Sequence, residues 1–128
     1  MERQNKRGSA GFTLVEVLII IAIIGILAAI AIAQFGEYRK RGFEATLKSD
    51  LRNAAAAQAA YFAQSQVYKS GALTNGTPPG YNQSAGISGI TSTIGINTFE
   101  LSATHFNCSG ISWTYSSTTG AVTGPPCP

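Results

Sequence analysis

Charged side chains are scarce in this sequence of 128 residues, where they make up 12%, about half the share that is usual in soluble domains. The nine basic residues outnumber the six acidic ones. Six of the nine form two short groups, Arg3, Lys6 and Arg7 at the beginning and Arg39–Arg41 farther on. No extended basic face remains, so we expect no dedicated nucleic-acid site.

Histidine and cysteine are also rare. His105 is the one histidine, and the two cysteines form no CxxC motif or Cys/His cluster. A single histidine without nearby carboxylates makes a poor metal or catalytic site, so we expect His105 at the surface or at a strand end. No Ser/His/Asp or Cys/His arrangement can be assembled. We therefore predict no enzymatic activity, no metal and no cofactor.

Proline is absent before Pro78, so no proline breaks a helix in the first half of the chain. An apolar run extends from Phe12 to Ala33, and Glu16 is its only charge. About 20 apolar residues suffice to span a bilayer as a helix. The basic residues before the run favour a cytoplasmic N-terminus, whereas Arg39–Arg41 oppose that orientation.

Beyond the apolar run, residues 34–66 keep a helical pattern. Apolar side chains recur at steps of three and four, as Phe43, Leu47, Leu51, Ala54/Ala55 and Tyr61/Phe62. The opposite, polar face is predicted to carry Glu44, Lys48, Arg52 and Gln58. Gly71 is the predicted stop. A helix over 12–66 would be about 80 Å long, so we expect half of it to be buried in lipid or in other subunits.

The last half of the chain is rich in Gly, Ser, Thr and Asn. Residues 70–97 read as a long connecting loop with a short strand near Ile87–Ile96. Alternating residues then predict strands, with Phe99, Leu101 and Ala103 on one face, followed by Ile111, Trp113 and Tyr115. Ser117–Gly120 is a turn signal, and Ala121–Thr123 a return strand. The expected fold class is α+β, with a long N-terminal helix packed on a small antiparallel sheet.

A small-residue pair, Ala10-Gly11, precedes the apolar run, whereas an ordinary secretory signal is cut after its apolar region. A cut after Gly11 would leave the apolar helix in the mature protein; a plain one-span anchor is the alternative. Glu16 would then be the fifth residue, and a carboxylate at such a position is usually functional. The new amine of Phe12 is its candidate partner, within one chain or between two. We favour pairing between subunits.

The segment GFTLVEVLIIIAIIGILAAIAIAQF (residues 11–35) resembles the class III signal and N-terminal helix of type IV pilins, in particular the type IVa branch. The matching positions are Gly11, Phe12, Glu16 and Gly25. The resemblance implies cleavage by prepilin peptidase after Gly11, N-methylation of Phe12, and assembly by an inner-membrane machine driven by a cytoplasmic ATPase. Many members of this family carry proline where this chain has Ala33, which puts a helix break there in doubt.

The resulting division is a leader (1–11), a long helix (12–66, with a membrane or filament core at 12–35 and an amphipathic part at 36–66) and a head (67–128). Because the head is expected outside the cytosol, Cys108 and Cys127 are predicted to form a disulfide; two free thiols are the alternative. The disulfide would bound a C-terminal loop and contribute about 3 kcal/mol.

The predicted function is that of a structural subunit of a type IV pilus. It is held in the inner membrane as a precursor and assembled with other subunits into an extracellular filament for adhesion, motility or DNA uptake. Two alternatives stay open. One is a pseudopilin of a type II secretion system, which shares the leader and helix. The other, from a different class, is a single-span anchored periplasmic binding module.

Overall fold

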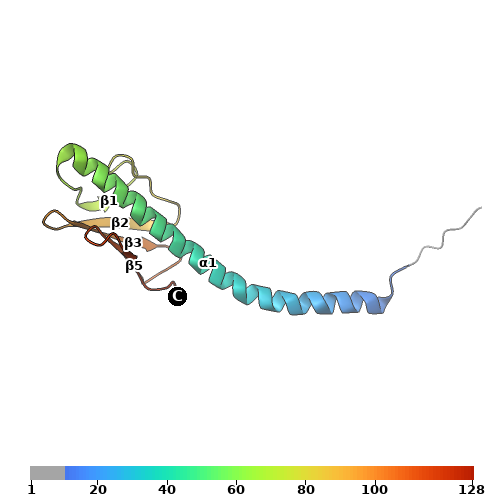
Figure 1. Ribbon diagram of the computed structural model, residues 1–128. Coiled ribbons are helices and arrows are strands. Elements are labelled where there is room, and N and C mark those ends of the chain that lie inside the picture. The colour runs from blue at the N-terminus through green and yellow to red at the C-terminus, as the bar shows by residue number, and fades with distance from the viewer. Residues whose placement is uncertain (1–10) are drawn as a thin grey trace, which may run out of the picture. The chain divides into compact units, whose positions relative to one another are not determined.

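The computed structural model describes residues 11–128, which form one long helix and a small antiparallel sheet (Figure 1). The elements follow each other as α1 (Leu14–Ser65), β1 (Gly71–Leu73), β2 (Ile87–Ile94), β3 (Phe99–His105), β4 (Trp113–Ser116) and β5 (Val122–Thr123). The chain divides into two compact units, Met1–Gly36 and Glu37–Pro128. This arrangement confirms the α+β fold class predicted from the sequence.

Helix α1 ends where one residue turns into the left-handed conformation. The residue after the helix, Gln66, has φ 58°, and its N–H donates to the carbonyl of Phe62 at 2.8 Å. The prediction that Gly71 stops the helix was wrong, because Gln66 already provides a left-handed cap. Gly71 instead begins β1, with φ 86°. Helix α1 continues through Ala33.

The five strands form a meander in which each strand pairs with the next one along the chain. All four pairings are antiparallel, in the order β1-β2-β3-β4-β5. At the predicted turn between β4 and β5, the Ser116 N–H donates to the carbonyl of Ala121 at 3.2 Å. The prediction of a long connecting loop over 70–97 was only partly right. This segment contains β1, which lies at the edge of the sheet and pairs Ala72 with Thr91 of β2.

The core of the Glu37–Pro128 unit lies between the second half of α1 and one face of the sheet, which run alongside each other in Figure 1. The helix contributes Leu47, Leu51 and Ala54, which are fully buried, as the predicted steps of four and three require. The sheet contributes alternate residues, because successive side chains on a strand point to opposite faces. The sheet residues of the core are Leu73, Ile87, Ile90, Phe99, Leu101, Ala103 and Trp113. The spacing of three between Ile87 and Ile90 reflects the irregular register between Ile87 and Gly89.

Gln58 was predicted on the polar face of α1, but it is fully buried. Its Nε2 donates to the Lys69 carbonyl at 2.6 Å and to Ser92 Oγ at 2.9 Å, while its Oε1 accepts from the Lys69 N–H at 2.9 Å. Burying an amide is tolerated when its donors and acceptor find partners. Gln58 therefore fixes the segment that leads from α1 to β1.

His105 was predicted at the surface or at a strand end. It is the last residue of β3, but it does not lie at the surface. It is 5% exposed, and its ring stacks on Phe43 with centroids 4.7 Å apart. Its Nδ1 accepts from the Asn107 N–H at 3.1 Å. The surface prediction was wrong because an imidazole can be buried when one face is packed against another ring and one nitrogen accepts a hydrogen bond.

Candidate assembly site

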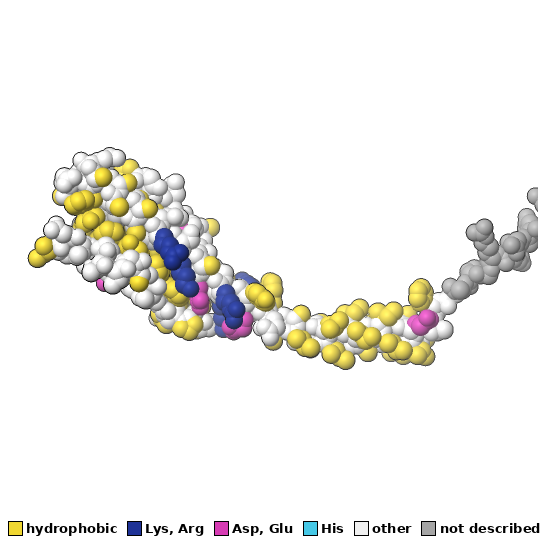
Figure 2. All heavy atoms as spheres, in the orientation of Figure 1, with side chains coloured by type: hydrophobic (Ala, Val, Ile, Leu, Met, Phe, Trp, Pro, Cys, Tyr) yellow, Lys and Arg dark blue, Asp and Glu magenta, His cyan; other side chains and the backbone are white. Residues whose placement is uncertain are grey.

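The first part of α1 exposes apolar side chains on every side. In the described part of the Met1–Gly36 unit, the exposed fraction is 82% for Phe12, 48% for Val17 and 75% for Ile32. Figure 2 shows hydrophobic side chains covering this part of the helix, with an acidic group near its beginning. The helix is long and apolar enough to cross a membrane by length and composition. A helix that is apolar all round needs lipid or other protein to cover it.

Glu16 and Thr13 form a capping box at the beginning of α1. Oε2 of Glu16 accepts from the N–H and from Oγ1 of Thr13, both at 3.0 Å. In return, the Glu16 N–H donates to Thr13 Oγ1 at 3.2 Å. Reciprocal bonds of this kind satisfy the first amide groups of a helix, which have no partner within it. Thr13 therefore determines where the helix begins and how the Glu16 carboxylate is held.

The carboxylate of Glu16 keeps one oxygen free for another partner. Both side-chain bonds end on Oε2, and within residues 11–128 no donor reaches Oε1. Glu16 is exposed and carries the only charge between Gly11 and Gly36. A carboxylate in this environment carries a large desolvation cost once apolar surfaces close around it, unless a cation pairs with it.

The predicted cleavage residues, Gly11 and Phe12, precede α1 and are exposed. A Cβ added at Gly11 would meet no atom within 4 Å, so nothing in the described chain requires glycine there. A requirement for glycine would have to come from whatever binds this segment. Within residues 11–128, no bond joins Phe12 to Glu16, so the proposed pairing between subunits stays a prediction.

Cys108 and Cys127 form a disulfide with Cα atoms 5.1 Å apart. Both residues are buried. The C-terminal segment is also held by the Cys127 N–H, which donates to Glu44 Oε1 of α1 at 2.9 Å. Glu44 had been predicted on the solvated polar face of the helix. Its role as a tether was missed because its partner lies 83 residues away, which no local pattern reveals.

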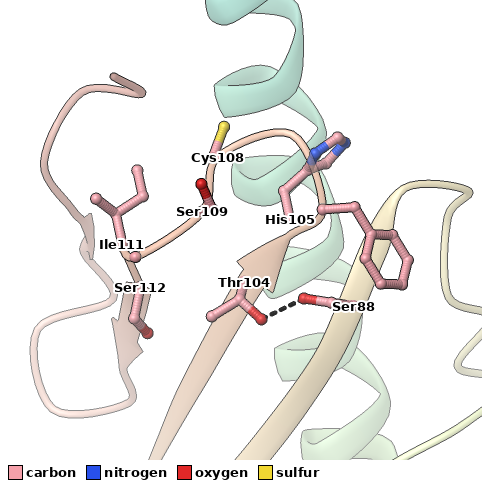
Figure 3. A pocket seen from close by; sticks show the side chains of 9 residues that line it. Ser88, Thr104, His105, Cys108, Ser109, Ile111 and Ser112 are labelled. Carbon is pink, nitrogen blue, oxygen red and sulfur yellow. Dashed lines mark hydrogen bonds between the residues drawn. The ribbon is translucent and has the colours of Figure 1, made fainter.

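An open hollow of about 440 Å³ lies beside the disulfide, at the end of the sheet where β3 ends. Figure 3 shows small hydroxyl side chains that line this hollow. Among them, the hydroxyl groups of Ser88 and Thr104 are hydrogen-bonded to each other. Among the residues that line the hollow, His105 has the one ionisable side chain. The His105 ring stacks on the ring of Phe43. The described residues contain no group of three or more His, Cys, Asp or Glu side chains that could hold a metal.

Sequence reasoning also missed Thr13, although a signal for it is present. Threonine followed three residues later by glutamate, directly before an apolar run, is the pattern of a capping box. Thr13 and Glu16 have this spacing. Asp50, by contrast, gave no sequence signal of its own. It is fully buried on α1, and its partners Tyr81 and Ser84 come from the segment between β1 and β2.

Comparison with known proteins gives consistent results. Residues 6–32 match the family described as the prokaryotic N-terminal methylation motif. The chain is 39% identical over 79 residues to the type IV major pilin protein PilA of Myxococcus xanthus, covering 62% of this chain and 36% of that protein. It is 38% identical over 79 residues to a fimbrial protein of Neisseria meningitidis (60% and 39%). Over 35 residues it is 57% identical to a fimbrial protein of Pseudomonas aeruginosa (27% and 23%). The chain spans less than half the length of these curated relatives.

Proposed function

Because this chain carries the N-terminal methylation motif and is similar to type IV major pilin and fimbrial proteins, we propose that it is a type IV pilin, a structural subunit of a type IV pilus. It is made as a precursor held in the inner membrane. Prepilin peptidase cuts it between Gly11 and Phe12, and Phe12 is N-methylated. The inner-membrane assembly machinery then incorporates it through α1 into a filament outside the cell, with the head of each subunit outward.

The observation that carries this proposal is the uncovered apolar surface of α1. The Glu37–Pro128 unit has a core of its own, whereas the large apolar residues from Phe12 to Phe35 are all at least 48% exposed. Lipid covers such a helix in the membrane. In a filament, the same surface packs against the helices of other subunits, so leaving the membrane exchanges lipid contacts for protein contacts.

Glu16 is suited to fix the register between neighbouring subunits. Oε2 is engaged in capping its own helix, while Oε1 is free to pair with the amine of Phe12 from a neighbouring subunit. The methylated amine keeps its positive charge. Among apolar helices an unpaired carboxylate costs several kcal/mol, so subunits that are out of register are disfavoured. We propose that this pair selects one offset between helices.

We further propose adhesion, motility or DNA uptake as the role of the fibre. The head has a polar, nearly uncharged surface, since Lys69 and Glu100 are the charged side chains after residue 66. That surface suits contact with many materials. The type II secretion pseudopilin and the anchored binding module are the competing proposals. The similarity to type IV major pilin and fimbrial proteins favours the pilin over both.

Intact mass of the protein in sheared cell-surface material, with and without reductant, tests the proposal. The expected species begins at methylated Phe12 and gains two hydrogens on reduction of Cys108–Cys127. A cut chain that stays in the membrane fraction would favour the pseudopilin. An uncut chain there would leave a plain membrane anchor and refute the proposal.

Two substitutions of Glu16 separate helix capping from charge pairing. Glu16→Gln keeps an acceptor for Thr13, because glutamine serves in capping boxes as well, but it loses the charge. Glu16→Ala loses both. We expect both variants to be cut and methylated, and neither to appear in sheared filaments. Normal filaments from Glu16→Gln, with none from Glu16→Ala, would show that capping is what matters and would contradict the intersubunit pair.

A further inference from the structure

The basic residues Arg39, Lys40 and Arg41 of α1 have no role in the proposed assembly, and they lie on the wrong side of the membrane for the usual charge rule. Basic residues normally accumulate on the cytoplasmic side of a span. Here they follow the apolar run, so the proposed precursor carries them on the opposite side. We refer to these three residues as the basic girdle. Figure 2 shows basic side chains gathered on this part of α1.

The charges of the basic girdle are mostly unneutralised. Lys40 Nζ lies 3.5 Å from a Glu37 carboxylate oxygen. Arg39 lies over the Phe43 ring, with its guanidinium carbon 5.8 Å from the centroid. Within the part of the chain that the structure describes, neither arginine has a carboxylate partner. Arg39 and Arg41 are both exposed, so two guanidinium groups are available to external anions.

The angular spread of the basic girdle favours an occupant that surrounds the helix. Successive residues of an α-helix are about 100° apart, so three in a row cover roughly 200° of its circumference. A single protein docking on one side of α1 would meet only one or two of them. A layer of lipid headgroups meets all three at once.

The depth of the basic girdle also fits a headgroup layer. Arg39 follows the last residue of the apolar run, Ala33, by six positions in the sequence, about 9 Å along a helix. Tyr38, next to the girdle, is 71% exposed, and tyrosine is enriched where a membrane meets water. Guanidinium groups bind phosphate through two parallel hydrogen bonds.

We propose that the basic girdle binds the phosphate headgroups of anionic phospholipids in the leaflet that faces away from the cytoplasm. This inference rests on the proposed function, because it requires the precursor to span the membrane. The lipid contacts hold the unassembled subunit at a fixed depth, with its head just outside the bilayer. They are released when the subunit enters the filament.

Lipid selectivity of the full chain in vesicles tests the inference. The chain is reconstituted into phosphatidylcholine vesicles with and without phosphatidylglycerol. Electron spin resonance of headgroup-matched spin-labelled lipids then gives the association of phosphatidylglycerol relative to phosphatidylcholine. One basic residue at an anionic surface is worth about fivefold in affinity at low salt. We expect Arg39→Gln/Arg41→Gln to lower the ratio at least about threefold, and high salt to lower the wild-type ratio.

The matched control removes two positive charges that follow the girdle in the chain, one on α1 and one on the segment after it. Arg52 and Lys69 are exposed, and Arg52→Gln/Lys69→Gln should leave the ratio within about 1.5-fold of wild type, since these charges lie beyond the girdle. The basic residues before Gly11 contribute equally in all three proteins. An equal fall in the control would overturn the inference, because net charge alone would then explain the effect.

The other outcomes are also decisive. An unchanged ratio in Arg39→Gln/Arg41→Gln would overturn the inference, and loss of filaments in cells from that variant would then assign the girdle to a protein partner. A chain that inserts into neither type of vesicle would refute the membrane-held precursor and this inference with it. The vesicles contain no assembly machinery, so a failure of filament assembly in cells leaves the lipid measurement valid.

Discussion

Asp50 connects α1 to the segment between β1 and β2, and its removal should destabilise the Glu37–Pro128 unit. The carboxylate is fully buried. Its Oδ2 accepts from the Ser84 N–H at 2.9 Å and from the Tyr81 hydroxyl at 3.3 Å, and its Oδ1 accepts from Ser84 Oγ at 2.5 Å. Asp50 thereby fixes a segment that also buries Pro78 and Tyr81.

The magnitude follows from these three bonds. A hydrogen bond to a charged group contributes about 1.5–3 kcal/mol net. The Ser84 groups can turn to water after Asp50→Ala, because Ser84 is exposed. The Tyr81 hydroxyl would stay buried without an acceptor. We therefore expect Asp50→Ala to lower the free energy of unfolding by about 3 kcal/mol, and Asp50→Asn, which keeps the shape and one acceptor, by about half as much.

Urea denaturation of the full chain in detergent, followed by Trp113 fluorescence, measures this difference. In a unit of this size each kcal/mol corresponds to about 4–8 °C in melting temperature, so thermal scans provide a second readout. Ser49→Ala is the matched control, because Ser49 is the exposed neighbour of Asp50 on α1; it should stay within about 0.5 kcal/mol of wild type. If Asp50→Ala also stays within that range, the carboxylate does not hold this segment and the reasoning fails.

Two further predictions concern the same unit. Burial, the Asp50 charge and the hydrogen bond to Asp50 raise the pKa of Tyr81 above its ordinary value of 10.0. The stability that this neutral phenol contributes is complete below pH 10 and is lost as the pH rises above it. The wild-type urea midpoint should therefore fall more steeply above pH 10.0 than that of Tyr81→Phe, and parallel curves would contradict this. Reduction of Cys108–Cys127, which are 19 residues apart, should cost about 3 kcal/mol; an unchanged midpoint with reductant would show that the disulfide contributes nothing to stability.

The parts of the fold that could be predicted are those with a repeating pattern. Leu47 and Leu51 repeat at helical spacing, and Phe99, Leu101 and Ala103 alternate as a strand with one buried face requires. Each pattern records one continuous buried surface. The burial of alternate residues in β3 therefore followed from the sequence, as did the burial of one stripe on the second half of α1.

The parts that could not be predicted depend on partners that are distant in the chain. Gln58 and Asp50 are polar residues on a helix, and local patterning assigns such residues to the solvated face. Both are buried because their partners, Ser92 and Ser84, lie 34 residues farther on. β1 was missed for a similar reason. Its three residues carry too little alternation to identify a strand, and it exists because β2 offers a free edge.

The residues of the candidate site fall into the same two groups, those that a local pattern identifies and those that depend on distant partners. Gly11, Phe12 and Glu16 were chosen from a local motif, and the structure adds Thr13, which belongs to the same local pattern. The tether from Glu44 to the Cys127 N–H could not be anticipated, because it joins the helix to the end of the chain. Residues that act within one turn of helix are readable from sequence, whereas residues that join distant segments require the structure.

The capping box also bears on how an apolar helix can keep an acidic group once lipid or other helices surround it. A carboxylate that accepts two hydrogen bonds from Thr13 has already exchanged part of its hydration for protein donors. The remaining cost of burying it falls on Oε1, which needs one cationic donor rather than a full shell of water. In the proposed filament, one amine from a neighbouring subunit would therefore suffice to complete the site. Without Thr13 that amine would have to replace more of the lost hydration, so the bonds from Thr13 to Glu16 would favour the proposed intersubunit pair.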